Sequence, residues 1–169
     1  MRSSLLRSAA LGVAAVLALG ATACGGGSAR ATTVRTLDPP GLGDQVLDLA
    51  VEPETAKVSA LRAVKRPYVD GVGLFSLRRD TQLEATLQIS RFNKDAKTGS
   101  ARFRDSVVRQ IGSTTPHEFR LGDDRVWLTT GRRQSVSVWF KDRYLFVLSV
   151  RDEYAQPRAL LRSVLQVEP

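Results

Sequence analysis

Residues 69–92, VDGVGLFSLRRDTQLEATLQISRF, decide the fold that we predict for this chain. In residues 82–92, apolar and polar side chains alternate. The apolar set is Leu83, Ala85, Leu87 and Ile89, and the polar set is Glu84, Thr86, Gln88 and Ser90. A period of two indicates a β-strand. With residues 69–79 as the first arm, this predicts a β-hairpin with one covered face and one face in water.

The residues around this hairpin predict further strands and helices. Helices are expected at 54–64, at 100–111, where Phe103, Val107 and Ile111 recur every four residues, and after Gln156-Pro157. Further strands are expected at 119–121, 125–130, 135–140 and 144–150. Residues 45–51 are expected to form either a short strand or an irregular entry to the domain. The order predicts an α+β fold, an antiparallel sheet of about five to seven strands flanked by about three helices. Length predicts one domain, residues 45–169.

Residues 1–23 have the composition of an exported leader. Arg2 and Arg7 form a basic start, residues 8–21 are apolar or small, and no acidic residue precedes Asp38. The apolar core is about a dozen residues long, shorter than the roughly 20 that a membrane-spanning helix needs. A cleaved leader is therefore expected rather than a permanent transmembrane anchor.

Ala21-Thr22-Ala23-Cys24, at the end of the leader, resembles the lipobox of bacterial lipoproteins. The resemblance implies a diacylglycerol thioether on Cys24 and cleavage before it. Cys24 is the sole Cys of the chain, and acylation would remove an unpaired thiol from an oxidising compartment. The alternative is an ordinary secretory leader that is cleaved at Ala21-x-Ala23.

Residues 24–44 are expected to be the lipidated Cys and a flexible tether, because Gly, Ser, Thr and Pro dominate them without hydrophobic periodicity. The lipid would anchor the domain at the cell membrane, on its extracytoplasmic face.

The charge of the chain is basic but mixed. Two of the 25 basic side chains lie in the leader, so the remaining 23 basic and 17 acidic side chains give a net charge of +6. An Arg-rich composition is typical of a GC-rich genome, and it would also suit an anionic membrane surface. Nucleic acid is not expected as a partner, because the basic residues are scattered along the chain.

Few residues have the spacing that catalysis would need. His117 is the single His, and it follows a Ser-Thr-Pro loop without a nucleophile placed beside it. No metal site is expected, since one His and no free Cys leave only carboxylates. The chain has no G-x-S-x-G, P-loop or dinucleotide motif, so no cofactor is expected.

Three aromatic residues, Trp127, Trp139 and Tyr144, form the candidate binding surface. Trp139 shares its strand face with Ser135 and Ser137, which suggests the wetter side of the sheet. An exposed aromatic cluster would mark a site of interaction. The alternative is that a helix covers this face and that the aromatic rings belong to the core.

In layout, residues 45–169 resemble the PsbP-like lipoproteins, and this resemblance implies a non-enzymatic accessory role in the cell envelope. Our first hypothesis is a membrane-tethered, non-catalytic envelope lipoprotein that binds other envelope components. The second is a carrier of an apolar ligand or lipid held between sheet and helices. The third is an enzyme of unknown type.

Overall fold

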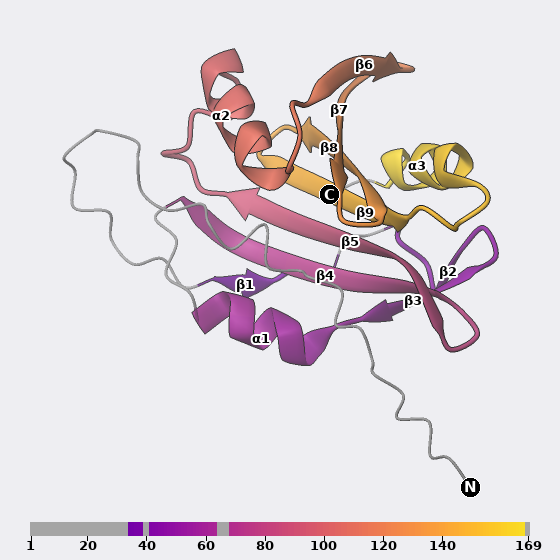
Figure 1. Ribbon diagram of the computed structural model, residues 1–169. Helices are drawn as coiled ribbons and strands as arrows, with labels where there is room; N and C mark the ends of the chain where they lie inside the picture. Colours follow the sequence, from indigo (N-terminus) through magenta and orange to yellow (C-terminus); the bar gives the residue numbers. More distant parts are fainter. Residues whose placement is uncertain (1–33, 39–40, 64–67, 168–169) are drawn as a thin grey trace, which may run out of the picture.

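The computed structural model describes residues 34–38, 41–63 and 68–167, which form one large sheet with helices on both faces (Figure 1). The strands are β1 (Arg35–Thr36), β2 (Gln45–Val46), β3 (Leu49–Pro53), β4 (Val69–Arg79), β5 (Gln82–Phe92), β6 (His117–Leu121), β7 (Asp124–Gly131), β8 (Gln134–Lys141) and β9 (Tyr144–Arg151). The helices are α1 (Thr55–Ala63), α2 (Ala101–Ile111) and α3 (Pro157–Leu165).

The sheet follows the order β2-β3-β4-β5-β9-β8-β7-β6, and every pairing on this path is antiparallel. The ninth strand, β1, pairs in parallel with β4. The α+β class, the antiparallel sheet and the three helices are confirmed. The predicted number of five to seven strands is wrong, because the described residues form nine.

The two additional strands, β1 and β2, have two residues each. A segment of two residues shows no periodicity in sequence. Both form because a longer neighbour, β4 for β1 and β3 for β2, offers its backbone hydrogen-bonding groups at the right place. Residues 45–51 are divided between β2 and β3 by a turn with Leu47 at φ 54°.

Helices cover both faces of the sheet. Helices α1 and α2 pack on one face through Val58, Leu61, Val107, Val108 and Ile111. Helix α3 packs on the other face through Leu160, Leu161, Val164 and Leu165. We call these two apolar layers the α1/α2 core and the α3 core. The expectation of a water-facing sheet face is wrong, since the polar residues Glu84, Gln88 and Ser90 of β5 are at most 5% exposed.

The N-terminal strand begins the folded part earlier than the predicted boundary at residue 45. Val34 is buried in the α1/α2 core, and its carbonyl oxygen accepts a hydrogen bond from Nε of Arg62 at 2.7 Å. Leu37 lies against β4, where a Cβ added at Gly71 would come within 2.7 Å of Cδ2 of Leu37. The glycines of β4 therefore make room for the N-terminal segment that ends at Leu37.

Helix α2 begins one residue after the expected start at 100 and ends at the expected residue, Ile111. Ser100 is the N-cap residue without a side-chain capping hydrogen bond, and Gly112 is extended, with φ −100°, rather than left-handed. A Cβ at Gly112 would lie 2.0 Å from Oγ1 of Thr129. Glycine is therefore needed here for the close approach of the helix end to β7, and not for a positive φ.

Candidate functional site

Cys24, the predicted lipidation site, lies outside the described residues. The three residues of the candidate binding surface do not form an exposed cluster. Trp139 is 0% exposed in the α3 core, Trp127 is 4% exposed in the α1/α2 core on the opposite face, and Tyr144 is half-buried beside the α3 core. The prediction fails because α3 covers the face that Ser135 and Ser137 suggested to be wet.

The buried aromatic rings stack on one another and so have structural partners. Trp139 stacks on Phe146, with centroids 5.1 Å apart and planes at 7°. On the other face, Trp127 and Phe140 meet edge to face at 6.0 Å. Such pairs contribute about 0.5–1.5 kcal/mol each beyond the burial of their area. One polar atom is left over, because Nε1 of Trp139 is buried and has no hydrogen-bond partner in the described structure.

His117 is the first residue of β6, and it is exposed. Its neighbour across the ladder is Leu128, which is 36% exposed. In the described part of the chain, no carboxylate or hydroxyl bonds to the imidazole. The position therefore does not have the geometry of a nucleophile–base–carboxylate triad, which needs each member to bond to the next.

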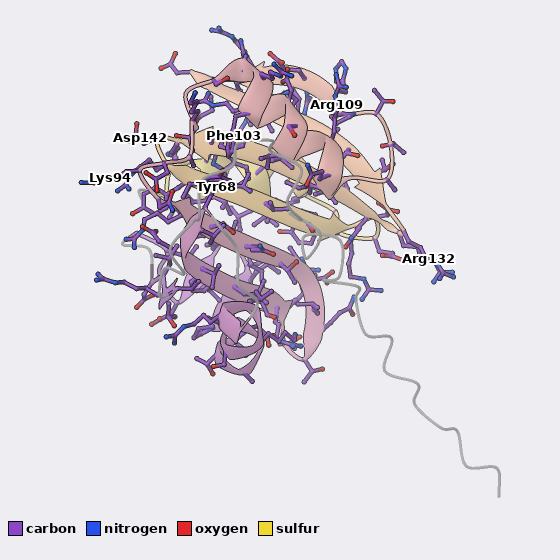
Figure 2. All side chains as sticks on the ribbon, turned by 90° about the vertical axis from the view of Figure 1, so that its left-hand side faces the viewer. Tyr68, Lys94, Phe103, Arg109, Arg132 and Asp142 are labelled. Carbon is purple, nitrogen blue, oxygen red and sulfur yellow. The ribbon has the colours of Figure 1, made fainter. Side chains whose placement is uncertain are left out.

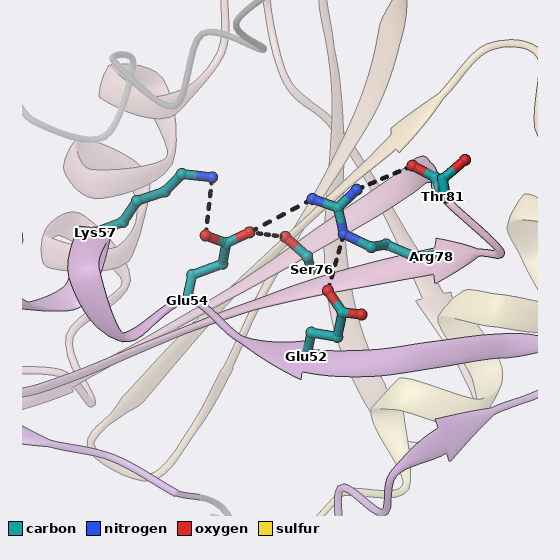
Figure 3. A network of polar contacts seen from close by, with 6 residues as sticks. All are labelled: Glu52, Glu54, Lys57, Ser76, Arg78 and Thr81. Atoms are coloured by element: carbon teal, nitrogen blue, oxygen red, sulfur yellow. Dashed lines mark hydrogen bonds and ion pairs between the residues drawn. The ribbon is translucent and has the colours of Figure 1, made fainter.

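One polar network joins β3, α1 and β4 (Figure 3). Ser76, which is 0% exposed, donates its hydroxyl hydrogen to Oε1 of Glu54. Oε2 of Glu54 pairs with Nζ of Lys57 at 3.1 Å, and Nε of Arg78 pairs with Oε2 of Glu52 at 3.0 Å. The guanidinium also donates from Nη1 to the carbonyl oxygen of Thr81 at 3.2 Å.

The electrostatics of this network favour a structural role. The hydrogen bond from Ser76, followed by the contacts with Lys57 and Arg78, holds the pKa of Glu54 below its usual value. A carboxylate that is held ionised is a poor general base near neutral pH. The Ser76 hydroxyl is inaccessible to a substrate because it is fully buried. The network therefore fixes the start of α1 on the sheet.

A second polar cluster joins three segments that are distant in sequence. The Tyr154 hydroxyl donates to Oδ1 of Asp48 at 3.2 Å, and Nη2 of Arg79 binds Oδ2 of the same carboxylate at 2.6 Å. Burial of Tyr154, together with this hydrogen bond, raises the pKa of its hydroxyl to about 12. The cluster holds the chain after β9 against the β2–β3 turn.

The outer strand β6 confirms the short strand expected at 119–121, and it begins two residues earlier, at His117. His117, Glu118 and Arg120 are exposed, and the two apolar residues of the strand are partly buried. Glu118 and Arg120 are both exposed, while Phe119 and Leu121 pack against the α3 core.

Three of the basic side chains lie apart from one another on the surface. Figure 2 shows Lys94 and Arg132 on opposite sides of the molecule, with Arg109 on a third part of the surface. Within residues 34–38, 41–63 and 68–167, no group of three or more His, Cys, Asp or Glu side chains is placed to hold a metal ion. Among the described helices, none has the length and apolar character needed to cross a membrane.

The fold and these clusters define an α+β protein with one antiparallel sheet between helices. When the chain is compared with models of protein families, with curated proteins and with solved structures, no match is found. Its function is therefore inferred from its own residues.

Proposed function

We propose that this chain is a membrane-tethered, non-catalytic lipoprotein of the bacterial cell envelope that acts as a binding or accessory module for other envelope components. In this proposal Cys24 carries the lipid, and the domain lies on the extracytoplasmic side of the cell membrane. The leader residues Arg2, Arg7 and Ala21-Thr22-Ala23-Cys24 support the anchor.

The observation that carries the proposal is the way in which the N-terminal segment enters the sheet. Val34 is buried, Arg35 and Thr36 pair with β4, and the backbone N–H of Leu37 donates to the carbonyl oxygen of Val72 at 2.8 Å. Only residues 25–33 separate Cys24 from this point, a distance of at most ~35 Å when fully extended. A domain on so short a connection would work close to the membrane surface.

The distribution of reactive side chains also supports binding rather than catalysis. The hydroxyl of Ser76, the carboxylate of Glu54 and the hydroxyl of Tyr154 are engaged in bonds that join elements of the fold. His117 is exposed on an edge strand. A catalytic set requires an acid, a base and a nucleophile in mutual contact around an accessible point, and these residues do not have that arrangement.

Native mass spectrometry of the chain extracted from its own membranes in mild detergent tests the proposal, with Cys24→Ala as the matched control. We expect an acyl mass on the wild-type chain, its loss in the control, and a co-purifying envelope protein. A wild-type chain that is unmodified and found outside the cell would overturn the anchor. Turnover of a substrate that is lost in His117→Ala would overturn the non-catalytic role.

A second candidate function, a carrier of an apolar ligand, is favoured by the indole of Trp139. Its Nε1–H lies in the α3 core without a partner in the described structure, and an unpaired buried donor costs about 1–3 kcal/mol. A bound lipid with an ester or hydroxyl oxygen would satisfy it. Organic extraction of the purified chain, followed by mass spectrometry, should then release a lipid at about one per chain. Extraction of none would exclude this candidate.

A further inference from the structure

The strand β6 forms a free edge of the sheet. It pairs with β7 on one side, and within the described residues no strand pairs with its other side. Figure 1 shows β6 at the outer margin of the molecule, far from β2 at the opposite edge. An exposed edge strand presents unpaired N–H and C=O groups and is a template for pairing with another strand.

The turn between β6 and β7 determines which residues of β6 direct these backbone groups outward. Leu121 faces Asp124 across the two-residue loop Gly122-Asp123, and Gly122 has φ 65°. In a two-residue hairpin the residues that flank the loop form a hydrogen-bonded pair, and such pairs alternate with non-hydrogen-bonded ones. The backbone groups of Glu118 and Arg120 therefore point away from β7.

The charges on this edge are incompletely matched within one chain. Arg120 lies directly opposite Arg125 on β7, and like charges in this position are destabilising. Nε of Arg125 pairs with Oε1 of Glu118 at 3.0 Å, whereas Arg120 has no ion pair among the described residues. A carboxylate supplied from beyond the edge, opposite Arg120, would complete the set.

A second copy of β6 supplies that carboxylate in one register. In an antiparallel pair of β6 strands, a residue whose backbone groups point outward must lie opposite another such residue of the second copy. The two-fold axis can therefore lie at Glu118, Phe119 or Arg120. An axis at Glu118 places two carboxylates opposite each other, and an axis at Arg120 places two guanidinium groups opposite each other. An axis at Phe119 pairs Glu118 with Arg120 of the second copy, twice.

We propose that two copies of this chain associate through antiparallel pairing of their β6 strands, with the two-fold axis at Phe119, so that one sheet continues through the dimer. The same patch serves both copies, as a two-fold interface requires. Because the contact is one five-residue strand on each side, the dimer should be weak in dilute solution. Confinement to a surface would strengthen it through a higher effective concentration.

Charge reversal on the full-length chain in detergent tests the pairing, using two differently tagged copies and capture by one tag. Arg120→Glu should abolish self-capture, because Glu118 then faces a carboxylate, and Glu118→Lys should abolish it for the opposite reason. A mixture of the two variants restores opposite charges at both positions and should restore capture. Each single variant should weaken association on the order of tenfold or more.

The matched control is Arg158→Glu, which makes the same change in charge at an exposed position of α3. It should associate like the wild type, and circular dichroism should show that all variants are folded. Self-capture by Arg120→Glu at the wild-type level, or no capture of wild type by wild type, would overturn the proposal.

A thiol at the axis tests the register independently of charge. In a Cys24→Ala background, Phe119→Cys places two thiols directly opposite each other and should form a disulfide-linked dimer under mild oxidation. Leu121→Cys should not, because the two thiols would be separated by four residue positions, roughly 13 Å. Cross-linking of both variants or of neither would overturn the register.

Discussion

Among the described glycines with a negative φ, Gly112 should be the one whose replacement by alanine lowers the free energy of unfolding most. A Cβ at this position would lie 2.0 Å from Oγ1, 2.3 Å from Cγ2 and 2.6 Å from Cβ of Thr129. Thr129 is 2% exposed and belongs to β7, so neither side of the contact has room to move. The backbone at Gly112 is extended, so the penalty is entirely steric.

The magnitude follows from two terms. Overpacking of a well-filled interior costs about 1–3 kcal/mol. To avoid the new methyl group, Thr129 would have to rotate and give up its contacts with Thr114, where its Oγ1 donates to the carbonyl oxygen at 3.1 Å and lies 3.0 Å from the Thr114 hydroxyl. An unsatisfied buried polar group costs about 1–3 kcal/mol. The sum is a loss of about 2–6 kcal/mol in the free energy of unfolding.

Urea denaturation followed by circular dichroism measures this loss. With an m-value of about 1–3 kcal/mol/M, the midpoint should fall by at least ~0.7 M at unchanged m. The control is Gly99→Ala, where a Cβ meets no atom within 4 Å. It should be neutral, or stabilising by up to about 1 kcal/mol, because alanine reduces the entropy of the unfolded chain.

A double-mutant cycle identifies the colliding side chain. Thr129→Ala removes the two nearest atoms of the contact, so it should partly rescue Gly112→Ala and give a coupling energy of favourable sign. If Gly112→Ala lay within ~0.5 kcal/mol of the wild type, the scale of an ordinary surface substitution, the close approach of α2 to β7 would be refuted.

Three further predictions concern the N-terminal strand and the two polar clusters. Gly73→Ala would place a Cβ 2.8 Å from the backbone oxygen of Leu37, so limited proteolysis should cut the N-terminal segment faster than in the wild type. Tyr154 has a raised pKa, so its contribution to stability is complete below pH 10 and is lost as the pH rises toward 12. In Tyr154→Phe, the decrease in stability between these pH values that is due to Tyr154 should be absent. The pKa of Glu54 is lowered, chiefly by the hydrogen bond from Ser76. The contribution of Glu54 to stability is therefore present above pH 4.5 and is lost as the pH falls through the folded-state pKa. In Glu54→Gln, the melting temperature should depend less steeply on pH in the acid range.

The strands and helices with a clear period were predictable from the sequence. The hairpin of β4 and β5, helix α2 and the β8–β9 pair lie at or within one residue of the expected limits. In each of these, the local pattern and the tertiary environment favour the same conformation, which is the condition under which local reasoning succeeds.

The candidate binding surface was not predictable in this way. Ser135 and Ser137 beside Trp139 suggested a wet face, but α3 covers it, and Trp139 is fully buried. Similarly, the polar residues of β5 lie beneath covering elements and not in water. A strand pattern records the polarity of each face, whereas burial depends on which helix returns to that face from elsewhere in the chain.

The sequence by itself determined the α+β class and the order of the long elements, because both depend on local periodicity. Only the tertiary structure decided that β1 completes the edge of β4, that Gly112 must lack a side chain, and that β6 remains as a free edge with Arg120 opposite Arg125. The physical reason is that these features arise from contacts between residues far apart in the chain, where the approach of two backbones, rather than the preference of either segment, determines which atoms meet.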